Sequence, residues 1–90
     1  MSAATGIVSD DAIVASSDEC ERAWRWYRLT CSDADVFAHR MWRAVREGES
    51  SDARAYARQV DAANDARRAA WAEYRRSIAR LTRLVAEPWA

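Results

Sequence analysis

Apolar residues in the first half of the chain recur at alternating spacings of four and three. The run comprises Cys20, Trp24, Tyr27, Cys31, Ala34, Ala38, Met41 and Val45. Apolar residues at this spacing predict one face of an amphipathic α-helix, sustained over more than three heptads. Ser16 and Glu19 form a capping box before the run. Gly48, a residue typical of the position after a helix end, follows it. We therefore expect a helix over about 18–47.

A polar stretch interrupts this pattern. Thr30, Cys31, Ser32 and Asp33 are all poor helix formers. The sequence therefore leaves two alternatives open: one continuous helix, or two shorter helices over 18–30 and 33–47. The heptad phase is the same on both sides of the stretch, and this favours the continuous helix.

The second half of the chain predicts a longer helix, because no Gly or Pro occurs from Asp52 to Glu87. Pro88 ends the predicted helix. Its apolar stripe consists of Tyr56, Val60, Ala63, Ala70, Trp71, Tyr74, Ile78, Leu81 and Val85. The stripe repeats closer to 11 residues in three turns than to seven in two, which predicts little left-handed supercoil. Helices over about 18–47 and 52–87, joined by a short turn, make an all-α antiparallel hairpin.

Residues 1–17 differ from the rest of the chain, because they contain neither Arg nor an aromatic residue. Two apolar pairs, at 7–8 and 13–14, lie on either side of a polar stretch. This segment fits either a one-turn helix capped by Ser9 or an extended arm. We expect an N-terminal arm over 1–17 and a single helical domain over 18–90.

The chain has more apolar surface than a two-helix hairpin can bury. It contains five Trp, and Trp26, Leu29, Val36 and Phe37 lie outside the predicted stripes. Aromatic residues at this density indicate a core or an interface. We therefore expect assembly into a helical bundle, most simply as a homodimer, and docking on a larger protein; the alternative is a compact three-helix monomer. The predicted core or interface residues are Trp24, Tyr27, Cys31, Met41, Trp42, Val45, Val60, Trp71, Tyr74, Ile78, Leu81 and Val85.

The charges are unevenly distributed, although the formal net charge is zero. Residues 1–52 carry six Arg and ten acidic residues, and residues 53–90 carry eight Arg and four acidic residues. The predicted partner-binding residues are Trp26, Phe37, Arg67, Arg68, Arg75, Arg76, Arg80 and Arg83. We expect this Arg cluster to pair with the acidic N-terminal half; the alternative is that it follows nucleic-acid phosphates. All 14 basic residues are Arg, and this usage indicates a GC-rich genome, bacterial or phage.

Few residues offer catalytic or metal chemistry. Cys20 and Cys31 lie too far apart along a helix to form a disulfide, and His39 is the single histidine. No nucleotide-binding loop, nucleophile elbow or metalloprotease motif occurs. We expect neither a metal nor a cofactor. An alternative is a small helical enzyme subunit with Arg67 in its pocket.

These observations favour a non-enzymatic interaction or assembly module that binds through an aromatic and Arg-rich helical surface. The longest apolar run is four residues, so we expect no membrane span and no membrane partner. No export signal is recognised at the start. We expect a cytoplasmic protein, or a virion component if the chain is phage-encoded.

Overall fold

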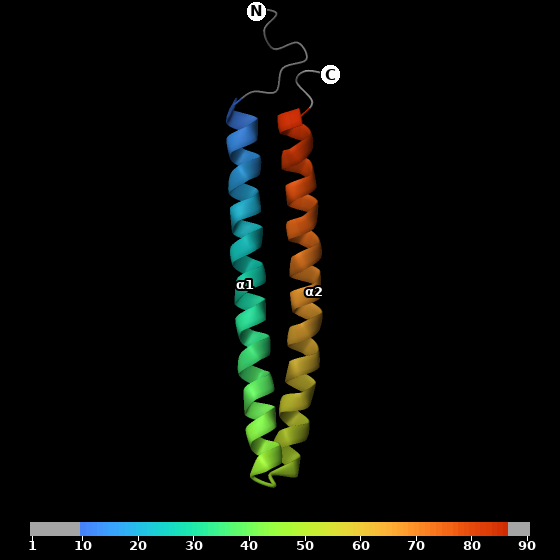
Figure 1. Cartoon of the computed structure of the whole chain (residues 1–90). Helices are drawn as coiled ribbons and strands as arrows, with labels where there is room; N and C mark the ends of the chain where they lie inside the picture. Colours follow the sequence, from blue (N-terminus) through green and yellow to red (C-terminus); the bar gives the residue numbers. More distant parts are fainter. Residues whose placement is uncertain (1–9, 87–90) are drawn as a thin grey trace, which may run out of the picture.

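The protein is an antiparallel hairpin of two helices in the computed structural model, which describes residues 10–86. Helix α1 spans Asp10–Arg46 and helix α2 spans Ser50–Ala86, each 37 residues long. At 1.5 Å per residue, each helix is about 55 Å long. The two helices lie side by side along their whole length (Figure 1). The predicted all-α hairpin is confirmed.

Helix α1 runs without a break through the polar stretch at 30–33. The Thr30 hydroxyl donates a hydrogen bond to the Tyr27 carbonyl oxygen at 2.7 Å, and Thr30 is buried against α2. The Thr30 hydroxyl is therefore satisfied inside the helix, and Ser32 is exposed to solvent. Of the two alternatives, the continuous helix is the one observed.

Helix α1 also begins eight residues earlier than the sequence pattern predicts. Residues 10–17 belong to the helix, so the expected arm is wrong for this part. Asp10 and Asp11 occupy the first turn, where negative charge is favourable. The proposed Ser9 cap lies outside the described residues, as do Pro88 and the rest of the predicted arm.

The turn between the helices follows from one glycine. Gly48 has φ of 73°, in the left-handed region that favours glycine. Its N–H donates to the Val45 carbonyl at 3.2 Å, and the Glu49 N–H donates to the Ala44 carbonyl at 2.9 Å. This pair of bonds is the Schellman motif, and it confirms the helix end expected at Gly48.

Small residues dominate the contact between the helices, which we call the seam. The buried residues within 10–86 are Cys20, Thr30, Ala34, Ala44, Ala70 and Ser77. None is larger than threonine, so neighbouring backbones can approach closely. Large apolar side chains at the seam, such as Val60 and Leu81, are only partly buried.

The seam side of α2 follows a seven-residue repeat. Its two buried residues, Ala70 and Ser77, are seven residues apart. Partly buried residues continue the alternating spacing of three and four on both sides of them: Ala53, Tyr56, Val60, Ala63, Arg67, Tyr74, Leu81 and Leu84. Further partly buried residues lie beside this series: Ala55, Ala57, Asn64, Ala72, Ile78 and Arg80. The predicted 11-residue period therefore does not describe the seam. It arose because Trp71 and Ile78 are more hydrophobic than their buried neighbours Ala70 and Ser77.

Neither α1 nor α2 contains a stretch that is apolar enough over a sufficient length to cross a membrane.

Candidate functional site: an exposed aromatic face

Four aromatic rings form a closed cluster near the middle of the hairpin. Trp24 and Tyr27 come from α1, and Trp71 and Tyr74 come from α2. The ring centroids of Trp24 and Tyr74 are 5.1 Å apart, and those of Tyr27 and Trp71 are 5.0 Å apart. Along each helix the two rings are separated by 5.6 Å. Tilted pairs at these distances attract each other beyond simple area burial.

The cluster lies at the edge of the seam and not inside it. Trp24 and Trp71 each remain 40% exposed, because each follows a seam alanine, Ala23 or Ala70. The same position in neighbouring heptads carries further apolar residues. Together these residues form one flank of the hairpin, which we call the aromatic face: Trp24, Cys31, Ala38 and Val45 on α1, and Trp71, Ile78 and Val85 on α2. Val45 and Val85 are more than half exposed.

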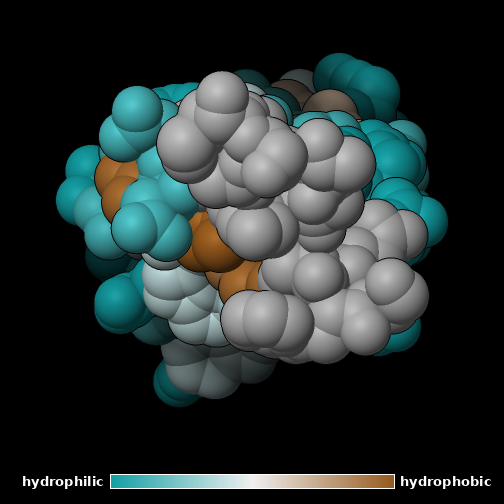
Figure 2. Space-filling model, turned by 90° about the horizontal axis from the view of Figure 1, so that it is seen from above, coloured by the Kyte–Doolittle hydropathy of each residue, from teal (hydrophilic) through white to brown (hydrophobic). Residues whose placement is uncertain are grey.

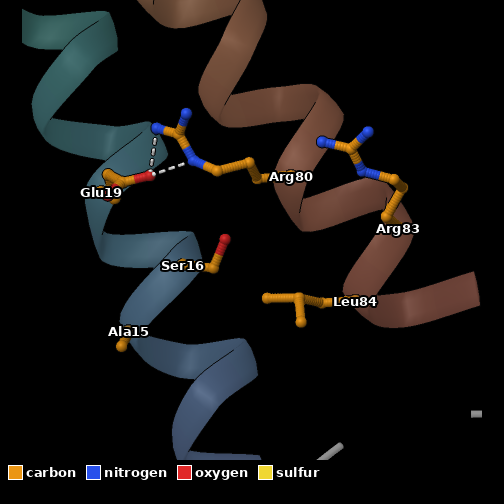
Figure 3. A pocket seen from close by; sticks show the side chains of 6 residues that line it. All are labelled: Ala15, Ser16, Glu19, Arg80, Arg83 and Leu84. Carbon is orange, nitrogen blue, oxygen red and sulfur yellow. Dashed lines mark hydrogen bonds and ion pairs between the residues drawn. The ribbon is translucent and has the colours of Figure 1, made fainter. Parts of the chain in front are cut away.

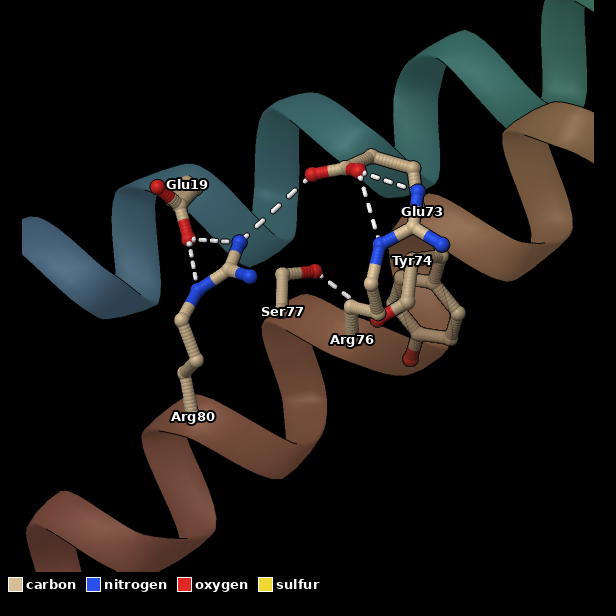
Figure 4. Close-up of polar contacts among 6 residues, drawn as sticks. All are labelled: Glu19, Glu73, Tyr74, Arg76, Ser77 and Arg80. Carbon is tan, nitrogen blue, oxygen red and sulfur yellow. Dashed lines mark hydrogen bonds and ion pairs between the residues drawn. The ribbon is translucent and has the colours of Figure 1, made fainter.

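Charged side chains line the opposite flank of the seam, which we call the polar face: Glu19 on α1, and Glu73, Arg76 and Arg80 on α2. Arg80 of α2 donates to the Glu19 carboxylate of α1 from Nε at 3.0 Å and from Nη2 at 2.6 Å. The Glu73 carboxylate lies 3.5 Å from Arg80 Nη2 and 2.7 Å from Arg76 Nη2 (Figure 4). The hydrogen bond from Arg76, supported by Arg80, holds the pKa of the Glu73 carboxyl below its ordinary value. On this polar face, Glu19 and Arg80 form the one ion pair among residues 10–86 that joins the two helices.

A smaller apolar patch lies on α1 on the side of the polar face. Trp26 follows Glu19 by one heptad and is 57% exposed, and Leu29 and Val36 are also exposed. Phe37, which we predicted to contact a partner, is partly buried, with the Arg40 guanidinium 5.8 Å from its ring centroid. The hairpin therefore has two exposed apolar surfaces, of which the aromatic face alone includes residues of both helices. In the end-on view of Figure 2, apolar atoms reach the surface between polar ones.

Near the turn, Trp42 is half exposed, and two polar side chains lie against its ring. The Arg46 guanidinium lies 4.6 Å from the Trp42 ring centroid, and the His39 ring lies 5.8 Å away. This stacking is typical of exposed cation–π pairs. Trp42 is therefore a surface residue of the hairpin.

The predicted core or interface residues divide into two groups. Tyr27, Cys31, Met41, Val60, Tyr74, Ile78 and Leu81 are partly buried, whereas Trp24, Trp42, Val45, Trp71 and Val85 are at least 40% exposed. As core residues of a single hairpin, the second group is misplaced; as interface residues, they remain a prediction. Sequence reasoning missed the seam residues Ala23, Thr30, Ala44 and Ser77. Small residues recurring every seven positions were the signal for them.

The Arg cluster of α2 is only partly tied to acidic residues. Arg68 pairs with Asp65 and Arg76 with Glu73, both within α2, and Arg80 alone reaches α1. The expected pairing with the acidic half therefore holds for Arg80 among the ion pairs of residues 10–86. Arg67 lies at the seam, and its Nε is buried with no hydrogen-bond partner within the described chain. Tyr27, Arg68 and Trp71 line a shallow depression of about 430 Å³ beside it.

A second depression, of about 450 Å³, lies where the two helices end (Figure 3). Its polar groups are Ser16, Glu19, Arg80 and Arg83, and Glu19 already binds Arg80. The Ser16 hydroxyl is buried without a hydrogen-bond partner among residues 10–86, so no base is hydrogen-bonded to it to activate it as a nucleophile. In the described residues, no group of His, Cys, Asp or Glu is arranged to hold a metal ion.

Both cysteines are free thiols. Cys20 is buried in the seam and Cys31 is partly buried on the aromatic face. A hydrogen bond with Cys31 raises the pKa of the Tyr27 hydroxyl. The reactivity of Cys20 therefore reports on the burial of the seam, and the reactivity of Cys31 reports on the burial of the aromatic face.

Comparisons with protein-family models, with curated proteins and with solved structures find no match to this chain.

Proposed function

We propose that this protein is a non-enzymatic assembly module in which two hairpins pack their aromatic faces together into a four-helix bundle. The observation that carries the proposal is the contrast in burial. Among residues 10–86 the buried side chains are all small, while Trp24 and Trp71 are each 40% exposed on one flank. Large apolar side chains left half exposed beside a small-residue seam are typical of a surface that a partner covers.

The heptad positions support a bundle of four helices. A helix with one helical neighbour needs apolar residues at two positions of each heptad, whereas a bundle helix uses a third. Trp24 and Cys31 occupy this third position on α1, and Trp71 and Ile78 occupy it on α2. Both third positions lie on the same flank, because the rings of Trp24 and Trp71 belong to one cluster.

The area of the aromatic face is sufficient for a stable dimer. A hairpin about 55 Å long and about 20 Å wide presents roughly 1,100 Å² on one flank. A standard protein interface buries about 800 Å² per partner. A second copy therefore has enough surface to cover, and the apolar rings supply the anchor residues that dominate binding energies.

The Trp26 patch supports a second contact, with a larger protein partner. Trp26, Leu29 and Val36 point away from the aromatic face and stay accessible in the proposed dimer. Exposed Trp and Arg are the residue types enriched at interfaces. In this proposal one face joins two copies and the other presents the pair to its partner.

Nucleic-acid binding through the Arg cluster is the weaker proposal. Half of the six Arg residues already form ion pairs with acidic residues, which reduces the free positive potential. We expect no detectable binding to non-specific duplex DNA near physiological salt. A log–log salt slope near −3.6, corresponding to about four neutralised phosphates, would instead favour this function.

Light scattering tests the proposed self-association. The chain mass is 10.2 kDa, so the wild type is expected at about 20 kDa at micromolar concentration. Trp24→Ala and Trp71→Ala should shift the mass toward the monomer. Trp26→Ala, which removes the same ring from the other side, is the matched control and should leave the dimer intact. A wild-type monomer, or equal effects of the Trp24 and Trp26 variants, would contradict the proposal.

A further inference from the structure

We infer that the second copy lies antiparallel to the first, with α1 on the partner's α1, α2 on the partner's α2, and the two-fold axis at the height of Trp24 and Tyr74. This arrangement rests on the proposed self-association through the aromatic face. It places the turns of the two hairpins at opposite ends of the assembly.

The charges beside the aromatic face on α1 favour the antiparallel arrangement. A two-fold interface is self-complementary: when residue i contacts residue j of the partner, j also contacts i. Glu21 and Arg28 are one heptad apart at equivalent, exposed positions, and Trp24 lies midway between them. An antiparallel contact centred on Trp24 therefore sets Glu21 against the partner's Arg28, and Arg28 against the partner's Glu21. Both copies gain the same ion pair, in which the partner's Arg28 joins Arg25, the residue that already pairs with Glu21 within α1.

The apolar residues of α2 on the aromatic face indicate the same axis. Trp71 and Ile78 are one heptad apart on the aromatic face, and their midpoint lies next to Tyr74. An antiparallel contact centred there sets Trp71 against the partner's Ile78, twice. The rings of Trp24 and Tyr74 are 5.1 Å apart, so these two residues lie at one height. Two independent pairs, one charged and one apolar, therefore share a single axis.

In the alternative, parallel arrangement the two aromatic faces also pack together, but the two-fold axis runs along the hairpin. This parallel alternative sets α1 against the partner's α2 at equal height. The contacts of Trp24 with Tyr74 and of Tyr27 with Trp71 fix which residues share a height. By this register, Arg28 would lie near the partner's Arg68, and Asp35 near the partner's Asp61. Like charges placed opposite each other disfavour an interface.

The antiparallel arrangement has one like-charge contact of its own, because Arg75 lies near the axis and meets the partner's Arg75. Its guanidinium lies 6.0 Å from the Trp71 ring centroid, and its side chain is exposed. A long exposed side chain keeps its charge in solvent while its stem covers apolar surface. The contact therefore lowers the affinity without preventing assembly, and removing the charge should tighten the dimer.

Charge exchange tests the arrangement in the wild-type background. Arg28→Glu should weaken the dimer about tenfold, because two symmetric ion pairs become two repulsions. Adding Glu21→Arg to it should restore the affinity, and Arg75→Gln alone should raise it. The parallel alternative predicts opposite signs: Arg28→Glu would tighten the dimer, and Arg75→Gln would weaken it by removing the contact with the partner's Glu21.

A distance measurement gives an independent readout. A spin label at His39→Cys, in a chain also carrying Cys20→Ala and Cys31→Ala, is expected about 45 Å from its counterpart, since each label lies about 22 Å along the helix from the axis. For the parallel alternative, pulsed electron paramagnetic resonance would give a distance of about 25 Å between the two labels, because both lie at the same height on the outer sides of a bundle about 20 Å wide. A dimer with the short distance overturns the antiparallel arrangement alone. A 10 kDa species without a dipolar signal overturns the proposed self-association as well.

Discussion

The seam and the aromatic face lie side by side on the same helices and are built from opposite kinds of side chain. The seam buries Ala, Ser, Thr and Cys, and its residue Ala70 is 2% exposed. The adjacent residue, Trp71, is 40% exposed. Burial in the hairpin therefore follows closeness to the seam and not hydrophobicity. A seam of small residues positions the helices but buries little apolar area, and apolar area is the main source of folding free energy.

This difference assigns separate roles to the two regions. The small seam and the ion pairs of Glu19, Arg80 and Glu73 set the distance and alignment of the helices. The aromatic face carries the large Trp24 and Trp71 rings, and solvent still reaches both in the single hairpin. On this account the stability of the fold depends on the second copy.

The largest effect is expected from the aromatic cluster. Trp71→Ala and Tyr74→Ala should each lower the free energy of unfolding by about 3 kcal/mol per chain, the usual cost of deleting a buried aromatic ring. Tyr74 lies at the seam, and Trp71 becomes buried when the second copy covers it. Arg76→Ala, on the exposed outer side, should cost about 0.5 kcal/mol or less. Urea unfolding of the three variants measures this. Equal losses would show that the long helix has been placed with the wrong face inward.

An effect of intermediate size is expected from overfilling the seam. Ala70→Leu should destabilise the hairpin by about 2 kcal/mol, because added methylenes force the helices apart. Ala69→Leu is the matched control, since Ala69 is exposed on the preceding position, and it should be nearly neutral. If both leucines were tolerated equally in thermal unfolding, the close seam would be refuted.

The thiols should distinguish the two regions by their reactivity. Cys20 is buried in the seam and is expected to react slowly with a thiol reagent at every protein concentration. Cys31 lies on the aromatic face, so its reaction should slow as concentration rises and the second copy covers it. Denaturant should release two titratable thiols, because burial and not oxidation protects them. A Cys31 rate independent of concentration would argue against coverage of this face.

The smallest effect concerns pH and the polar face. The pKa of Glu73 is lowered by Arg76 and Arg80, so its ionised form stabilises the fold above the ordinary pKa of a glutamate. This contribution is lost as the pH falls through the lowered value. Glu73→Gln should therefore flatten the acid side of the stability profile. Asp61→Asn removes an equal charge that forms no ion pair within residues 10–86 and should leave the slope unchanged; identical profiles for both variants would contradict this role of Glu73.

Much of the fold could be predicted from spacing alone. The four–three pattern from Cys20, the helix end at Gly48 and the absence of Gly and Pro after Asp52 all indicate the hairpin that is observed. The continuity of α1 was harder to predict, because Thr30 has low helix propensity. Its hydroxyl bond to Tyr27 and its burial in the seam resolve the conflict.

The seam could not be identified by ranking hydrophobicity. Such a ranking prefers Trp24, Trp71 and Val45 to their neighbours Ala23, Ala70 and Ala44, and so it shifts the predicted contact by one residue. The structure places the alanines inward, because close helix packing selects small volume over apolar character. The interhelical pair of Glu19 and Arg80 could not be predicted either. It depends on the register between the two helices, and the heptad pattern of one helix contains no information about that register.

Thermal unfolding as a function of protein concentration tests most directly whether a second copy completes the fold. If folding and dimerisation are coupled, mass action raises Tm with concentration. For a dimer of this size, unfolding enthalpies of about 0.7 kcal/mol per residue give a rise of about 4 °C for each tenfold increase. The account predicts this rise over a hundredfold range from the low micromolar. A Tm that stays constant over the same range would contradict it and show that the hairpin is stable with its aromatic face uncovered.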